Sequence, residues 1–138
     1  SSALAVPASL FIPVTARGTS ESFWVVTGTT RDGEISGDVA LAAQSTATVV
    51  ILMGLNRIKE IMGKFLASGK SETPVAIIQN GTLPDQKSVM GNVSTIADLA
   101  AAAGIGSPAI IVVGEVVTLS QRLEEITTQA VTQFRYGT

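Results

Sequence analysis

The sequence predicts one α/β domain over residues 1–138, with a mixed β-sheet of about five strands flanked by helices. Three observations support this fold class. Short runs rich in Val and Ile alternate with segments of helical spacing, the connections between them are short, and one connection joins two strand-like runs directly as a hairpin. No linker or internal repeat divides the chain, so we expect a single domain.

The first strand is expected at residues 22–29, where β-branched and aromatic side chains precede a turn at 31–33. A short helix should follow at 38–44, with Asp38 as its N-cap. Residues 47–53 are apolar without alternation, which is typical of a strand buried on both faces. We therefore expect a central strand here, covered by helices above and below.

A helix is predicted at 55–69, because its apolar residues recur on one stripe and Gly69 can terminate it. The stripe consists of Leu55, Ile58, Ile61, Met62, Phe65 and Leu66. The hairpin follows, with arms at 74–80 and 87–93.

The next helix should begin with a capping pattern of Thr95 and Asp98 and stop at Gly104. The final strand is expected at 108–114 and is followed by an amphipathic helix at 119–134. Residues 124–138 are expected to fray into a tail.

The charge pattern argues against nucleic acid as a partner. The net charge is −2, and the nine basic residues are scattered rather than gathered into a stripe. No apolar run is long enough to span a bilayer, and the first residues lack the basic start of a signal peptide. Together with the absence of cysteine, this favours a soluble protein of the cytoplasm that does not contact a membrane.

Much common catalytic chemistry is missing from this chain. Without histidine or cysteine, the chain cannot form a Ser-His-Asp triad or a metal site with nitrogen and sulfur ligands. Gly104-x-Gly106 precedes a strand instead of following one, so it does not fit the dinucleotide-binding fingerprint. This narrows the possible enzyme classes sharply. We predict no metal ligand in this chain, although a site built from Asp and Glu alone stays an open, unsupported alternative.

Two strand ends are candidates for ligand binding, because ligands of α/β sheets lie outside the carboxyl ends of the strands. The segment 53–55 follows the central strand, and 80–82 follows the next one. Gly81 would let a ligand approach the backbone, and the thioether of Met53 would suit a flat ring such as a purine. The spacing alone also allows a purely structural role, with Met53 filling core space and Gly81 supplying a positive φ.

Four segments, taken together, resemble a known family. "IPVTARG" (12–18), "VVILMGL" (49–55), "PVAIIQNGTLPDQKSVMGNV" (74–93) and "GSPAIIVVGEVV" (106–117) are similar to successive signatures of the tetrapyrrole methylases, above all those acting on uroporphyrinogen III. The resemblance implies S-adenosylmethionine as the methyl donor, bound between two α/β domains, and precorrin-2 as the product for siroheme and corrinoids. It covers only the C-terminal half of such an enzyme, which implies a longer protein whose own N-terminal domain is absent here and which forms a homodimer.

The resemblance also implies site residues. Its cofactor contacts fall on Met53, Gly81, Pro108, Ala109, Ser1 and Ser2. Arg17 would bind carboxylates of the substrate, although a solvated loop arginine is an equal alternative. Ala16 stands where the family often has histidine. The resemblance places the family's Gly-rich loop and proton-transfer groups upstream, which implies that no catalytic residue lies in this chain and that the chain alone is inactive.

Two alternatives stay open. The same fold could act as a non-catalytic dimerisation or scaffold module, or the protein could be a sister methylase with a different substrate. Upstream sequence would separate an enzyme from a scaffold module, because only the enzyme needs the Gly-rich loop.

Overall fold

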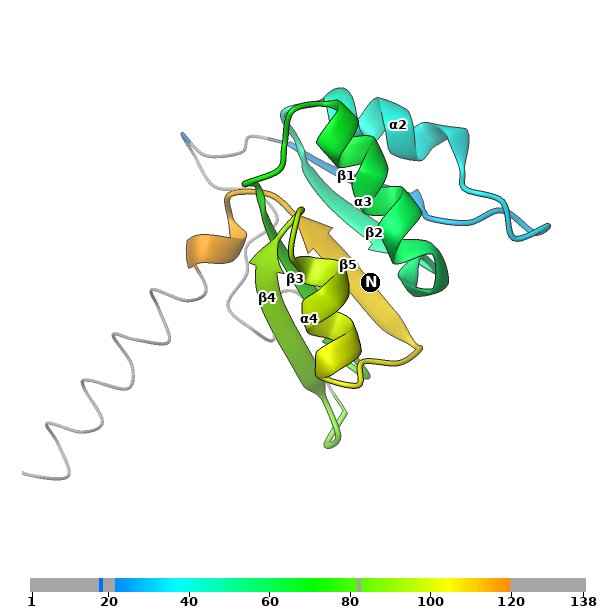
Figure 1. The fold of residues 1–138 in the computed structure, drawn as a ribbon, viewed down its shortest axis with the longest axis vertical. Helices are drawn as coiled ribbons and strands as arrows, with labels where there is room; N and C mark the ends of the chain where they lie inside the picture. The colour runs from blue at the N-terminus through cyan, green and yellow to red at the C-terminus, as the bar shows by residue number, and fades with distance from the viewer. Residues whose placement is uncertain (1–17, 19–21, 82, 120–138) are drawn as a thin grey trace, which may run out of the picture.

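The computed structural model describes residues 18, 22–81 and 83–119, which fold around one sheet with helices against it (Figure 1). The elements along the chain are β1 (Phe23–Thr27), α2 (Gly37–Gln44), β2 (Thr48–Leu52), the 3-10 turn η1 (Leu55–Arg57), α3 (Ile58–Ala67), β3 (Pro74–Gln79), β4 (Lys87–Asn92), α4 (Ile96–Ala102) and β5 (Ala109–Val113). These elements confirm the predicted α/β class. The predicted tail at 124–138 lies outside the described residues.

The sheet is mixed and has five strands in the order β1-β2-β5-β3-β4. β1 pairs with β2 in parallel, whereas β5 runs antiparallel to both β2 and β3, and β4 runs antiparallel to β3. Consequently β1, β2 and β3 end at the same edge of the sheet, where β5 begins. The last described strand is thus inserted between two strands that end at least 30 positions before it begins.

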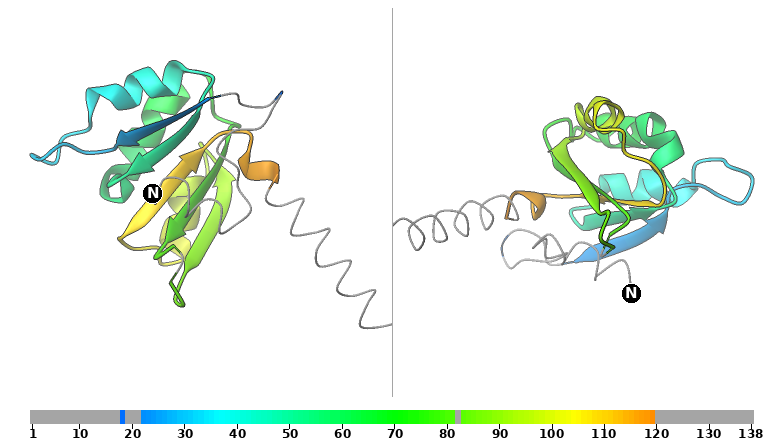
Figure 2. Two further views of the ribbon diagram at one scale, coloured as in Figure 1. Left: turned by 180° about the vertical axis from the view of Figure 1, so that it is seen from behind. Right: turned by 90° about the horizontal axis from the view of Figure 1, so that it is seen from below.

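Alternating side chains divide the core into two clusters, one on each face of the sheet. Ile51, Ile77 and Ile111 belong to the cluster that packs on α2, α3 and α4. The other cluster contains Val50, Ala76, Ile78, Ile110 and Val112 and packs on Val116 and Val117. Figure 2 shows α2, α3 and α4 on one face of the sheet. On the other face the described cover is the segment 116–119, whose last three residues are helical.

The start of α2 corrects a prediction. Ser36, not Asp38, is the N-cap, and its hydroxyl accepts a hydrogen bond from the Asp38 amide at 3.3 Å. Asp38 instead lies in the first turn, where a carboxylate favours the positive end of the helix dipole. Serine and aspartate both suit an N-cap and a first helical turn, so the two-residue shift could not be predicted from the residue types.

The helix ends behave as predicted, whereas the start of α4 does so only in part. In α3 the amide of Lys70 donates to the Phe65 carbonyl, and Gly69 has a φ of +76°, which is the Schellman arrangement. Gly104, with a φ of +67°, ends α4 in the same way. Thr95 is the N-cap residue of α4 as predicted, and Asp98 lies in the first turn. The side-chain cap is nevertheless missing, because the Thr95 hydroxyl accepts the amide of Asn92 at 3.0 Å instead of a helical amide.

Candidate functional site

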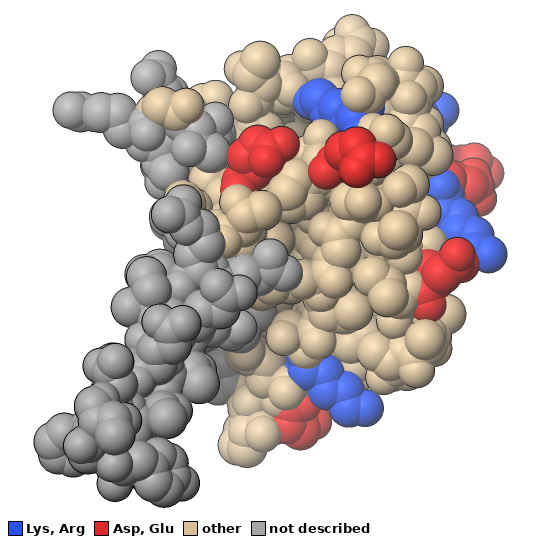
Figure 3. All heavy atoms as spheres, turned by 60° about the vertical axis from the view of Figure 1, so that its left-hand side comes forward, with Lys and Arg blue, Asp and Glu red and all other residues tan. Residues whose placement is uncertain are grey.

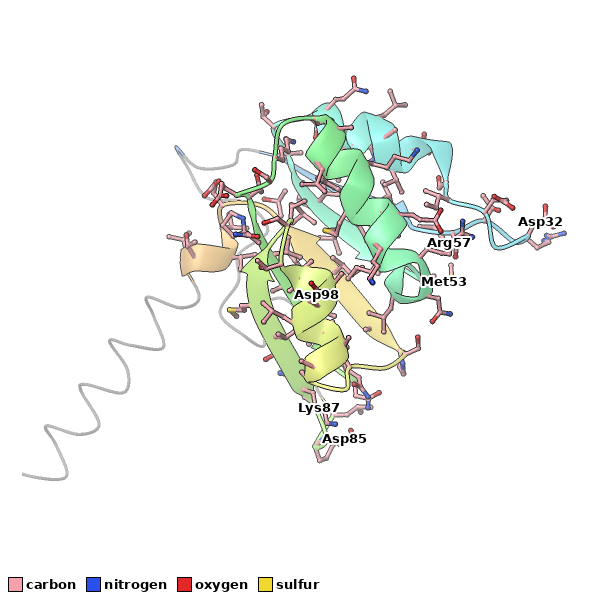
Figure 4. The ribbon with its side chains drawn as sticks, in the orientation of Figure 1. Asp32, Met53, Arg57, Asp85, Lys87 and Asp98 are labelled. Atoms are coloured by element: carbon pink, nitrogen blue, oxygen red, sulfur yellow. The ribbon has the colours of Figure 1, made fainter. Side chains whose placement is uncertain are left out.

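Three of the predicted site residues meet at the edge where β2 and β3 end. Met53 follows β2, and Pro108 and Ala109 lie at the start of β5; all three line one cavity of about 400 Å³. These residues come together because β5 lies between β2 and β3, so that its first residues are adjacent to the ends of both strands. Figure 4 shows Met53 at this end of the sheet, close to Arg57, which also lines the cavity.

Gly81 is not among the residues that line this cavity. The amide of Asn80, the residue before it, donates to the Pro108 carbonyl at 3.0 Å. The Asn80 side-chain amide also donates to Asp85 Oδ2 at 3.0 Å, and the Asn80 carbonyl accepts from the Leu83 amide. The hairpin loop is therefore fixed to the start of β5, with Gly81 next to that attachment point.

Met53 has an unusual conformation and an unusual exposure. Its φ is +52° and its side chain is 67% exposed, so the structural alternative in which it fills core space is wrong. Asn80 has a φ of +51°. Left-handed residues other than glycine are uncommon, and methionine lacks the short polar side chain that makes this conformation acceptable for asparagine. Strained residues of this kind are often found at ligand sites.

The cavity is also lined by residues that the sequence patterns did not single out. Thr29 and Gly33 belong to the turn between β1 and α2, whereas Asn56 and Arg57 belong to η1. The Thr29 hydroxyl donates to the carbonyl of Met53 at 2.8 Å. Since Thr29 follows a strand that also ends at this edge, the strand-end rule applied to Met53 would have found it.

Two glycines bring the ends of β1 and β2 together. The Gly28 amide donates to the Leu52 carbonyl at 2.6 Å. A Cβ atom on Gly28 would lie 2.7 Å from the Cα atom of Gly54, which is closer than real Cβ contacts. Only glycine at position 28 therefore fits this contact beside Met53 without displacement of the backbone.

The charged group of the cavity wall is Arg57. Its guanidinium binds Glu60 through two hydrogen bonds, Nε to Oε1 at 2.7 Å and Nη2 to Oε2 at 2.8 Å. Its Nη1 donates to the carbonyl of Gly33 at 2.6 Å. The hydrogen bond between the two side chains raises the pKa of Arg57 and lowers the pKa of Glu60, so both remain charged over an extended pH range.

The remaining predicted site residues fall in the part of the chain that the structure does not describe. Ser1, Ser2, Ala16 and Arg17 lie outside the described residues.

The described residues show neither a metal site nor a membrane-spanning helix. Within the described ranges, no group of three or more Asp and Glu residues could hold a metal ion. No described helix combines the length and apolar character needed to cross a bilayer. On the face drawn in Figure 3, acidic and basic side chains are interspersed.

The chain matches a family described as Tetrapyrrole (Corrin/Porphyrin) Methylases over residues 1–97. It is 39% identical over 120 residues to a uroporphyrinogen-III C-methyltransferase of Methanocaldococcus jannaschii, a match that covers 86% of this chain and 50% of the relative. A siroheme synthase of Methylobacillus flagellatus is 38% identical over 113 residues, covering 81% of this chain and 24% of that protein. The chain thus spans half the length of the first relative and about a quarter of the second.

A solved structure has the same fold as the described domain. It is the uroporphyrin-III C-methyltransferase of Thermus thermophilus, described as complexed with S-adenyl homocysteine. The TM-score is 0.70 and the sequence identity 26%, and the match covers 80% of this chain and 49% of that one.

Proposed function

The chain belongs to the tetrapyrrole methylase family, and from this premise we propose that it is the C-terminal domain of an S-adenosylmethionine-dependent uroporphyrinogen-III C-methyltransferase. The substrate is proposed from the Methanocaldococcus jannaschii relative, whose name carries it and which is 39% identical. The proposed product is precorrin-2, the precursor of siroheme and corrinoids. As the resemblance implies, we also propose a homodimer in the cytoplasm.

One observation carries the proposal: Met53 is exposed and left-handed on the wall of a strand-end cavity that also contains Pro108 and Ala109. The cavity volume of about 400 Å³ lies within the roughly 300–1,000 Å³ typical of small-molecule sites. A thioether facing such a cavity can pack on an aromatic ring, and the adenine of S-adenosylmethionine provides one. These residues therefore fit the methyl donor.

The contribution of this domain is to position the donor. S-adenosylmethionine supplies a methyl group on a sulfonium, and transfer requires sulfur, methyl and acceptor carbon to be aligned. Met53 would support the adenine ring, while the backbone around Asn80, Gly81 and Ala109 would fix the height of the ligand above the sheet edge. We assign no proton transfer to these residues, and we propose that the other domain supplies it.

A titration tests the cofactor assignment. S-adenosylhomocysteine is titrated calorimetrically into the 138-residue chain and into a hybrid that joins it to the part of the M. jannaschii relative that it does not match. We expect binding by the hybrid and little or none by the chain alone, because two domains form the proposed cleft. Equal affinities would contradict the two-domain cleft.

The role of Met53 is tested in the same hybrid. Met53→Ala should weaken binding about two- to tenfold, the range for loss of one sulfur–aromatic contact. Leu41→Ala is the matched control, since it also removes an exposed apolar side chain, but from α2. If both variants bind as the unsubstituted hybrid does, Met53 does not contact the ligand.

The substrate is tested by transfer of a labelled methyl group. We expect the hybrid to methylate uroporphyrinogen III and to give the dimethylated product. Transfer only to another tetrapyrrole would identify a sister methylase instead. Binding without transfer to any tetrapyrrole would favour the scaffold alternative.

A further inference from the structure

The turn between β1 and α2, residues 28–36, is a rigid unit on the rim of the cavity. Thr29 and Ile35 form an isolated antiparallel bridge, and the Thr30 amide donates to the Glu34 carbonyl at 2.7 Å. The turn closes at Gly33, which has a φ of +80° and whose amide donates to the Thr30 carbonyl. Because these bonds lie within the turn, they keep its shape but do not fix its position. Its position depends on its bonds to other parts of the site.

The first attachment joins the turn to Met53. The Thr29 hydroxyl donates to the Met53 carbonyl, a bond between residues 24 positions apart. A left-handed methionine is intrinsically unfavourable, so its carbonyl keeps this direction only if other groups hold it. Thr29 is such a group, and it comes from a neighbouring strand end rather than from the segment that contains Met53.

The second attachment joins the far end of the turn to η1. Arg57 Nη1 donates to the Gly33 carbonyl, and the other two nitrogens of the same guanidinium, Nε and Nη2, donate to Glu60. A guanidinium is planar, so the two bonds from Nε and Nη2 to one carboxylate fix the direction in which Nη1 can donate. Glu60 therefore aims Arg57 at the turn.

Resting on the proposed function, we propose that Thr29 and Arg57 are positioning residues for S-adenosylmethionine. Through the carbonyls of Met53 and Gly33, they hold the turn and the segment 53–57 as two walls at a fixed separation. Thr29, Gly33, Met53 and Arg57 all line the same cavity, so a change in either attachment alters the width of the space that the ligand enters. Neither residue needs to contact the reacting atoms for this role.

Affinity measurements on the hybrid test the first attachment. Thr29→Val removes the hydroxyl at constant shape and should weaken S-adenosylhomocysteine binding about fivefold, the effect of one net hydrogen bond. Thr29→Ser keeps the hydroxyl and should restore the affinity. Thr30→Val is the control, because it makes the same substitution at the next position of the turn without changing the Thr29–Met53 bond. Normal binding by Thr29→Val, or failure of Thr29→Ser to restore it, would overturn the inference.

The second attachment is tested with Arg57→Met, for which we also expect about fivefold weaker binding. Arg31→Met is the control, because it removes a positive charge from the same turn without changing the Arg57–Gly33 bond. If the two variants bind S-adenosylhomocysteine equally well, the bond from Arg57 to Gly33 has no effect of its own on affinity, and the second attachment is overturned.

Amide hydrogen exchange separates this inference from the proposed function. Peptides covering 28–36 and 53–57 should exchange faster in Thr29→Val and Arg57→Met than in the two controls, in the absence of ligand. If no form binds S-adenosylhomocysteine but this exchange result is obtained, the proposed function fails and the two attachments stand. Unchanged exchange would overturn the attachments whatever the hybrid binds.

Discussion

Met53 combines two properties that rarely occur together in a residue next to a buried strand. Its side chain is mostly exposed although Ile51, two residues earlier, is completely buried. Its positive φ directs the chain away from the strand and into η1. The exposure of the thioether is thus a result of the backbone conformation at Met53.

The strain at Met53 can be measured by comparing two truncations. Met53→Ala and Met53→Gly both remove the side chain, but only glycine adopts the left-handed conformation without steric cost. We expect the Gly variant to be more stable than the Ala variant by about 1 kcal/mol in urea unfolding. An Ala variant of equal or greater stability would show that position 53 is not strained.

The Arg57–Glu60 pair predicts a dependence of stability on pH. Hydrogen bonding to Arg57 lowers the pKa of Glu60 from its ordinary value of 4.5, so its stabilising effect is present above that pH and is lost as the pH falls through the lowered folded-state pKa. The stability difference between the unsubstituted chain and Glu60→Gln should therefore shrink towards acidic pH. Both side chains are solvent-accessible, so the difference will be small at any pH.

Urea unfolding between neutral and acidic pH measures this difference. Glu72→Gln, which removes an exposed carboxylate from the loop between α3 and β3, is the control. A Glu60→Gln difference that grows as the pH falls would contradict the assigned direction.

At the scale of the element, α3 shows how one residue type has opposite effects at two positions. Gly69 lies beyond the helix end with a φ of +76°, whereas Gly63 lies within α3 and has free space around the position of a Cβ atom. Gly104 repeats the first situation at the end of α4. The ends of α3 and α4 therefore require glycine for its left-handed conformation, whereas the glycine inside α3 could be replaced by another residue.

Two alanine substitutions in α3 should shift stability in opposite directions. Gly69→Ala forces a left-handed alanine and should cost about 1 kcal/mol. Gly63→Ala should stabilise the chain by up to about 1 kcal/mol, because alanine has the higher helix propensity. Thermal and urea unfolding of both variants measure the shifts, and a shift of the same sign in both would refute this explanation of the helix end.

Helix and strand positions could largely be predicted from the sequence, because they follow from local periodicity and turn residues. The N-cap at Ser36 was missed because Ser36 and Asp38 are both good caps and lie two residues apart. The insertion of β5 was not predicted either, since strand pairing depends on contacts between distant segments. Arg57 was missed for a related reason, because it acts on Gly33, 24 positions away. Thr29 follows the end of β1 and could have been found by the strand-end rule, but its bond to Met53 could not.

At the scale of the whole molecule, β5 joins the two parts of the sheet. Ile111 is opposite Ile51 in β2 and opposite Ile77 in β3, and all three are completely buried. No other described strand connects the β1–β2 pair to the β3–β4 hairpin. The described sheet should therefore unfold as one unit, although its two parts are separated in sequence.

Ile111→Ala tests this cooperativity. We expect a loss of about 2–5 kcal/mol, as for other large-to-small changes in buried positions. Fluorescence of the single tryptophan, Trp24 in β1, and far-UV circular dichroism should give coincident transitions in the variant and in the unsubstituted chain. Leu66→Ala, at an exposed position of α3, is the control and should change stability much less. Separate transitions would show two independent units.

The position of β5 also has a consequence for the order of events during protein synthesis. Ribosomes make the chain from its N-terminus, so Met53 and Asn80 are translated well before Pro108 and Ala109. Until the residues of β5 have left the exit tunnel, β2 and β3 cannot become its neighbours, and one wall of the cavity does not exist. A nascent polypeptide stalled before β5 should consequently be unable to capture a ligand at this edge, so the ligand cannot guide the earlier stages of folding.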